Sequence, residues 1–113
     1  YYDAPNSQVS MSEKSCLLNL LGILYDAQHR FAEGEATYRE ALEIRRSLAK
    51  ENPAAFLPEK SDTAFNLAIL MYNIKHDLPA SRALFEEALE GYSQFEHLAE
   101  DADEVRKILK ELF

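Results

Sequence analysis

Apolar residues recur along this chain every three or four positions, the spacing that places them on one face of an α-helix. Between residues 31 and 50 the stripe consists of Gly34, Tyr38, Ala41, Leu42 and Leu48, with the aliphatic stem of Arg45. The chain contains only three Gly and four Pro, too few for a sheet with many turns. The pattern therefore predicts an all-α protein.

The first two helices are defined by a start signal and by this stripe. Ser10 followed by Glu13 has the spacing of a capping box, which opens the first helix near Met11. The second helix covers residues 31–50. Residues 1–10 show no periodicity, so we expect them to be extended or frayed.

Prolines and one further cap define the other three helices. Pro53 stops the second helix, because proline has no N–H and restricts the residue before it. Pro58 suits the first turn of a third helix, and Pro79 suits the first turn of a fourth. A cap at Asp101 predicts a fifth helix over residues 102–112.

The first predicted helix is apolar on more than one face. Its apolar side chains are Leu17, Leu18, Leu20, Leu21, Leu24 and Tyr25. A surface helix carries a single apolar stripe, so we expect this helix to lie between neighbours. We expect Cys16 to pack beside it, because no nearby base or electropositive setting would make this thiol a nucleophile.

The chain contains one helical unit twice. A shift of 47 residues aligns Tyr25 with Tyr72, His29 with His76, and residues 40–43 with residues 87–90. Such matches predict a repeated hairpin of two helices.

The third helix fits a shift of 46 residues better. That shift places Ala68 rather than Ile69 opposite Gly22, and a close helix contact tolerates Ala better than Ile. It requires one extra residue in the turn between Lys75 and Leu78.

The charge of the chain bears on its partners. The formal net charge is −8, whereas nucleic acids and anionic membranes attract clustered Lys and Arg. We therefore expect neither as a partner, and a basic or neutral protein fits better. Acidity that only keeps a helical surface soluble is the alternative. A single cysteine and the absence of a long apolar run make a cytoplasmic location the default expectation.

No catalytic, cofactor or metal site is predicted. His29 and His76 occupy equivalent turn positions, which indicates a structural role, and His97 has no suitable metal-ligating neighbours. The three glycines are isolated, so they form no phosphate loop. We expect a protein that is not an enzyme, since a helical enzyme would need a deep pocket with convergent ionisable groups.

The helical hairpins resemble tetratricopeptide repeats over residues 12–100. In that family, small residues allow the two helices to approach closely, and an aromatic side chain fills the space beside them. In the first unit the matching residues are Gly22, Tyr25, Gly34, Tyr38 and Ala41, and in the second they are Ser81, Phe85 and Ala88. The spacing exceeds the common period of about 34 residues and is similar to that of kinesin light chains and bacterial multi-repeat proteins.

The resemblance implies a right-handed α–α superhelix. Its hairpins would be residues 11–53 and 58–100, with residues 101–113 as a capping helix. The first helix of each hairpin would line a concave face that holds a partner peptide or helix. The polar candidates on that face are Asn19, Asp26, Asn66 and Asn73. Acidic or neutral residues there disfavour capture of a C-terminal carboxylate, which needs Lys or Arg.

Two functions stay open at this point. The first is non-catalytic protein binding on the concave face. The second is structural, because a stable solenoid generally needs about three repeats. The chain would then form a homodimer or one section of a longer array, and Tyr1 and Tyr2 would pack against a neighbouring repeat.

Overall fold

The computed structural model describes residues 4–113, with side chains for residues 9–113. Within that range all regular elements are helical, which confirms the all-α class. They are α1 (Ala4–Ala27), α2 (Phe31–Glu51), α3 (Pro53–Leu70), the π-helix η1 (Met71–Lys75), α4 (Leu78–Tyr92), the 3-10 helix η2 (Glu96–Leu98) and α5 (Ala99–Leu112). The contacts expected of Tyr1 and Tyr2 lie outside the described residues.

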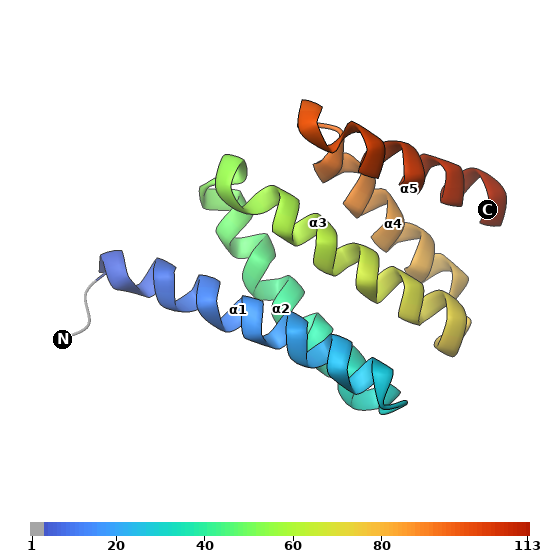
Figure 1. The fold of residues 1–113 in the computed structure, drawn as a ribbon, viewed down its shortest axis with the longest axis horizontal. Coiled ribbons are helices and arrows are strands. Elements are labelled where there is room, and N and C mark those ends of the chain that lie inside the picture. Colours follow the sequence, from blue (N-terminus) through green and yellow to red (C-terminus); the bar gives the residue numbers. More distant parts are fainter. Residues whose placement is uncertain (1–3) are drawn as a thin grey trace.

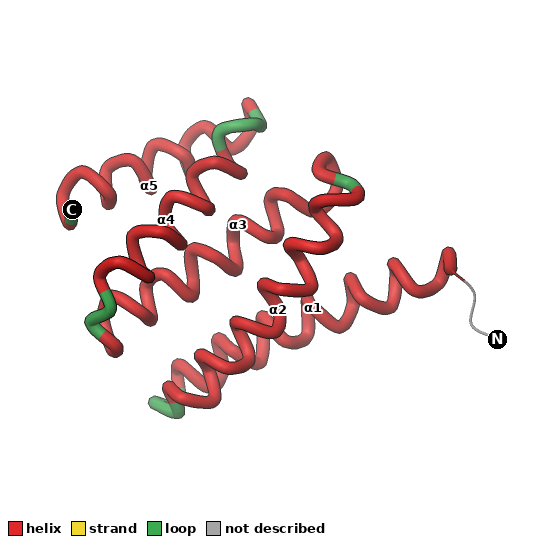
Figure 2. Tube along the Cα trace, turned by 180° about the vertical axis from the view of Figure 1, so that it is seen from behind, coloured by secondary structure: helices red, strands yellow, loops and turns green. Residues whose placement is uncertain are grey.

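The five α-helices form two layers (Figure 1). Helices α1, α3 and α5 run in similar directions and form one layer, while α2 and α4 run in the opposite direction and form the other. Each α-helix packs on the next one along the chain. The result is a row of helical hairpins with α1 at one edge and α5 at the other (Figure 2).

Helix α1 begins at Ala4, so the expected extended segment over residues 1–10 is wrong where the structure describes it. Pro5 is compatible with the first turn of a helix, because the N–H groups there have no helical partner. No helix breaker follows until Gly22. The capping-box pattern at Ser10 therefore lies inside the helix instead of at its start.

Helix α3 begins at Pro53 instead of the predicted Pro58. Pro53 occupies the first turn, where its missing N–H costs no helical hydrogen bond. Pro58 then lies inside the helix, where it has no N–H to donate to the carbonyl of Ala54. Ala54 is exposed, so water can satisfy that carbonyl.

Helix α5 begins at Ala99, and no side chain caps it. The predicted cap at Asp101 is wrong, because η2 leads the chain directly into the helix. Glu100 and Asp101 lie in the first turn instead, where their charges favour the positive end of the helix dipole.

The core lies between the two layers and depends on small residues at the helix contacts. Its largest fully buried apolar side chains are Tyr38, Phe85, Leu67, Leu70 and Val105. A Cβ at Gly22 would lie 2.7 Å from the ring of Tyr38, so only glycine fits there without movement. Ala68 is fully buried beside α4, and its carbonyl accepts a hydrogen bond from the Ser81 hydroxyl at 2.9 Å. Ile69 is partly exposed, which confirms the 46-residue register.

The extra residue of the second unit lies in η1. A π-helical turn holds one residue more than an α-helical turn, so Met71–Lys75 accounts for the change of shift from 46 to 47 residues. The predicted position was the following turn. His29 and His76 then close the two hairpin turns with φ angles of 63° and 54°, which confirms their equivalent turn roles.

The expectation that α1 lies between neighbours is wrong in this structure. Helix α2 packs on one side of it. On another side the chain exposes Leu17, Leu20, Leu21 and Leu24. Cys16 is also exposed, so its expected packing role is wrong. Helix α1 is an edge helix with an apolar outer face.

Candidate partner-binding groove

Asn19 lies between helices. Its Oδ1 accepts a hydrogen bond from Thr63 Oγ1 at 3.0 Å, which joins α1 to α3. Thr63 Oγ1 in turn accepts a hydrogen bond from Arg45 Nη1 at 2.8 Å. A partner could use the Asn19 carbonyl oxygen only by competing with this interhelical network.

Arg45 is the centre of that network and is only 5% exposed. Its Nη1 also donates to the carbonyl of Glu59 at 3.1 Å, and its Nε donates to Ser15 Oγ at 3.3 Å. These acceptors are neutral, so hydrogen bonds to dipoles solvate the buried guanidinium. Sequence reasoning assigned only the stem of Arg45 to packing, because its partners lie on two other helices.

Asp26 lies near the contact between α1 and α2. Tyr38 is buried in that contact, and burial together with the charge of Asp26 raises the pKa of its phenol to about 12. Asp26 is itself half-buried. The position of Asp26 therefore follows from the packing of the first hairpin.

Asn73 lines an open groove between α3 and α5. The groove has a volume of about 360 Å³. Its other lining residues are Ile69, Tyr72, Phe85, Ile108 and Leu112. The lining contains no Lys, Arg, Asp or Glu, so it is neutral. Apolar walls with an amide and a phenol side by side suit a segment that buries an apolar side chain and hydrogen-bonds through its backbone.

The four predicted residues do not form one cluster. The 46-residue register pairs Asn19 with Phe65 instead of Asn66, because the 47-residue shift begins only within η1. Asn66 is half-buried on α3, one helical turn after Thr63. Of the four residues, Asn73 is the one that the structure places in the groove lining.

Sequence reasoning missed an aromatic cluster at the groove, in which Tyr72 and Phe85 line the groove and Phe113 packs beside them. The ring centroid of Phe113 lies 6.0 Å from that of Tyr72 and 6.3 Å from that of Phe85. The sequence predicted a fifth helix over residues 102–112, but gave no sign of which helix Ile108 and Leu112 face. A predicted helix alone could not identify a groove.

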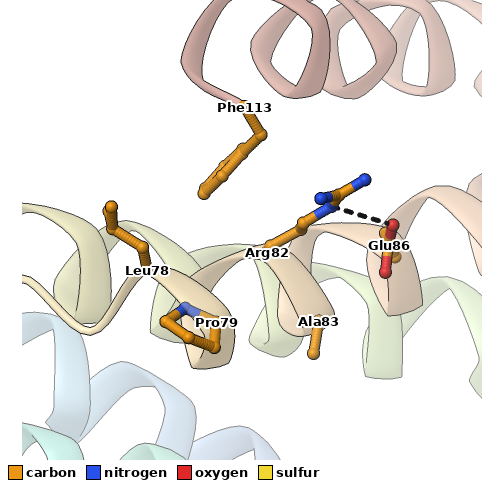
Figure 3. A pocket seen from close by; sticks show the side chains of 6 residues that line it. All are labelled: Leu78, Pro79, Arg82, Ala83, Glu86 and Phe113. Carbon is orange, nitrogen blue, oxygen red and sulfur yellow. Dashed lines mark ion pairs between the residues drawn. The ribbon is translucent and has the colours of Figure 1, made fainter.

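Phe113 borders a second hollow of about 400 Å³ on the outer side of α4 (Figure 3). Leu78 and Pro79 form one end of it, and the ion pair of Arg82 and Glu86, with 3.4 Å between Nε and Oε2, forms the other. Both charged residues are exposed, so this hollow is a charged, open surface. The groove between α3 and α5 is the better candidate for binding.

Two kinds of site are not found in the described residues. No group of three or more His, Cys, Asp and Glu side chains there is arranged to hold a metal ion. No helix in the described range combines the length and the apolar character that crossing a bilayer requires.

Comparisons with protein-family models, with curated proteins and with solved structures found no match. The tetratricopeptide resemblance therefore stays a prediction that depends on the residues quoted for it. The groove between α3 and α5 is the feature of the structure that bears on function.

Proposed function

We propose that this protein is a non-catalytic interaction module that holds a peptide or helix of a protein partner against the layer of α1, α3 and α5. In this proposal the two hairpins are tetratricopeptide-type repeats, the layer is the concave face of a right-handed superhelix, and α5 is the capping helix. The protein needs no cofactor for this function, and its partner is neither a nucleic acid nor a membrane.

The groove between α3 and α5 is the observation that carries the proposal. It combines partly exposed apolar side chains, such as Ile69, with the amide of Asn73 and the phenol of Tyr72. An amide donates and accepts at once, so it can bind a peptide backbone without demanding a particular side chain. Ile108 and Leu112 can then select an apolar side chain of the partner.

A selection from a random peptide library tests the proposal. We expect the immobilised protein to enrich peptides that share an apolar residue. Ile69→Glu combined with Asn73→Ala should weaken their binding at least tenfold, because the charge opposes burial of an apolar partner. Ser47→Ala on the exposed side of α2 is the matched control and should bind normally. No enrichment, or equal binding by the groove variant, would refute the proposal.

The alternative is a structural role as a homodimer or as a section of a longer array. The exposed leucines of α1 favour it, because soluble monomers rarely leave a large contiguous apolar patch uncovered. Light scattering separates the two: a stable monomer that binds library peptides supports the groove, whereas an obligate dimer that buries α1 or α5 supports self-assembly.

A further inference from the structure

The outer face of α1 carries an apolar stripe that is uncovered in the described chain. Leu17, Leu20, Leu21 and Leu24 are spaced by three and four residues and are 67%, 52%, 38% and 56% exposed. This spacing places them on one side of the helix over two turns. A stripe of this kind is the usual signature of a face that packs against another helix.

The structure relates α1 to α3 residue by residue. Ser15 and Ser61, which are 46 residues apart, are both fully buried. Lys14 pairs with Glu40 of α2 at 3.5 Å, and Lys60 pairs in the same way with Glu87 of α4 at 3.6 Å. Each first helix therefore sits on its own second helix in the same register.

In the same register, the residues of α3 that correspond to the leucine stripe of α1 are mostly buried. The counterparts of Leu17, Leu21 and Leu24 are Thr63, Leu67 and Leu70, which are 0%, 0% and 2% exposed. The counterpart of Leu20 is Asn66, which is half-buried.

Helix α2 covers this side of α3. Arg45 of α2 donates to Thr63 Oγ1, and Arg39 of α2 lies with its Nη2 3.7 Å from the sulfur of Met71, the residue after α3. Within the described residues, no helix covers the outer face of α1 in the way that α2 covers α3.

We infer that the leucine stripe of α1 is a docking surface for the second helix of a further helical hairpin, which packs on α1 as α2 packs on α3. The docked helix is apolar along its buried side. Where α2 carries Arg45 to donate to Thr63, the docked helix faces Leu17, which accepts no hydrogen bond, so a buried Arg there would lose that partner.

A second copy of this chain offers no free helix of this kind. Its α2 is already covered by α3, and α5 at the opposite edge turns charged side chains outward. The exposed charged residues of α5 are Glu100, Asp101, Asp103, Glu104, Arg106, Lys107, Lys110 and Glu111. The stack is therefore closed by a polar helix at the α5 edge and open at the α1 edge, which favours an additional hairpin as the occupant.

An extended chain tests this inference independently of the groove. A second copy of residues 4–53 is joined to Gln8, so that Pro53 of the copy replaces Ser7, its counterpart in the 46-residue register. The copy carries Arg45→Met, because Leu17 cannot accept the hydrogen bond of the guanidinium. The extended chain should unfold in a single transition at a higher temperature than the unextended chain. Amide hydrogens from Leu17 to Leu24 should exchange about tenfold more slowly, because local stability controls their exchange.

The pair of substitutions Leu21→Glu and Leu24→Glu is the control. It should abolish the slowed exchange in the extended chain, yet leave the folding of the unextended chain nearly unchanged, because both side chains are exposed there. Two separate unfolding transitions, or unchanged exchange in α1, would overturn the inference. A concentration-dependent dimer of the unextended chain that Leu21→Glu disrupts would overturn it too, by making a second copy the occupant.

Discussion

At the residue scale, equivalent positions in the two hairpins solve the same packing problem with different chemistry. Ser15 Oγ donates to the carbonyl of Ser12 at 2.8 Å and accepts from Arg45 Nε. Ser61 is equally buried, but its Oγ has no hydrogen-bond partner among the described residues. The Ser61 side chain lies instead against Gly91, and a Cβ added to Gly91 would come within 1.8 Å of Ser61 Oγ. The same residue type is therefore stabilising in one hairpin and costly in the other.

This difference predicts opposite effects of one substitution. Ser15→Ala should lower the free energy of unfolding by about 1 kcal/mol, because it leaves the Arg45 Nε without its partner. Ser61→Ala should leave the free energy unchanged or raise it by up to about 1 kcal/mol, because it removes a buried hydroxyl that gains no bond. Urea unfolding of both variants measures this, and a comparable loss in the two would contradict the assignment.

A residue with a left-handed backbone conformation in a hairpin turn gives a second prediction. His76 has a φ of 54°, a conformation that glycine adopts without the steric cost of a Cβ. His76→Gly should therefore stabilise the fold by about 0.5–1 kcal/mol in thermal unfolding. His97→Gly, in η2 and outside the positive-φ positions, should stabilise nothing. Equal effects of the two would argue against strain at His76.

At the element scale, sequence patterns predicted the type and number of the helices better than their ends. Pro53 and Pro58 both suit a first turn, so the local pattern does not distinguish them, and the structure starts α3 at the earlier one. The one-residue insertion followed from comparing Ala68 with Ile69, but its form as a π-helix did not, because local spacing does not reveal where a helix widens. The network around Arg45 was also beyond prediction, since it joins three helices.

An ion-pair network links the elements and predicts a pH dependence. Burial alone would raise the pKa of the Glu87 carboxyl on α4, but hydrogen bonding to Arg46 of α2 and the charge of Lys60 on α3 outweigh burial and lower it. A carboxyl with a lowered pKa in the folded state stabilises the fold above its unfolded pKa of about 4.3, and this stability is lost as pH falls through the folded value.

Urea unfolding between pH 7 and pH 3 measures this contribution. The free energy of unfolding should fall more steeply for the wild type than for Glu87→Gln, by about 1 kcal/mol over the range. Parallel pH profiles for the two proteins would show that the pairing with Arg46 adds no stability.

At the scale of the whole molecule, the two edges of the helical row differ. The inner face of α5 buries Ala102 and Val105 in the core, whereas the outer face of α1 leaves its leucines exposed. The broad apolar character of the first helix was visible in the sequence, but the absence of a covering neighbour was not. Of the predicted site residues, Asn73 alone reaches the groove lining, because the groove arises only when α5 packs beside α3.

Because the two edges differ, substitutions on α5 and on α1 should have different effects on the free energy of unfolding. Val105→Ala should cost about 2 kcal/mol, because it opens a cavity at a site that is 1% exposed. Leu20→Ala, at a site that is 52% exposed, should change stability by less than about 0.5 kcal/mol. Chemical denaturation tests both, and a large loss for Leu20→Ala would mean that α1 is already covered in solution.

The binding groove is tested most directly by hydrogen exchange with and without a peptide selected from the library. The bound peptide should slow exchange in two segments, residues 66–73 and 105–112, which flank the groove, and leave exchange in α2 unchanged. Slowed exchange confined to α2 or to the outer side of α4 near Arg82, or no change in any segment despite binding, would refute binding in the groove.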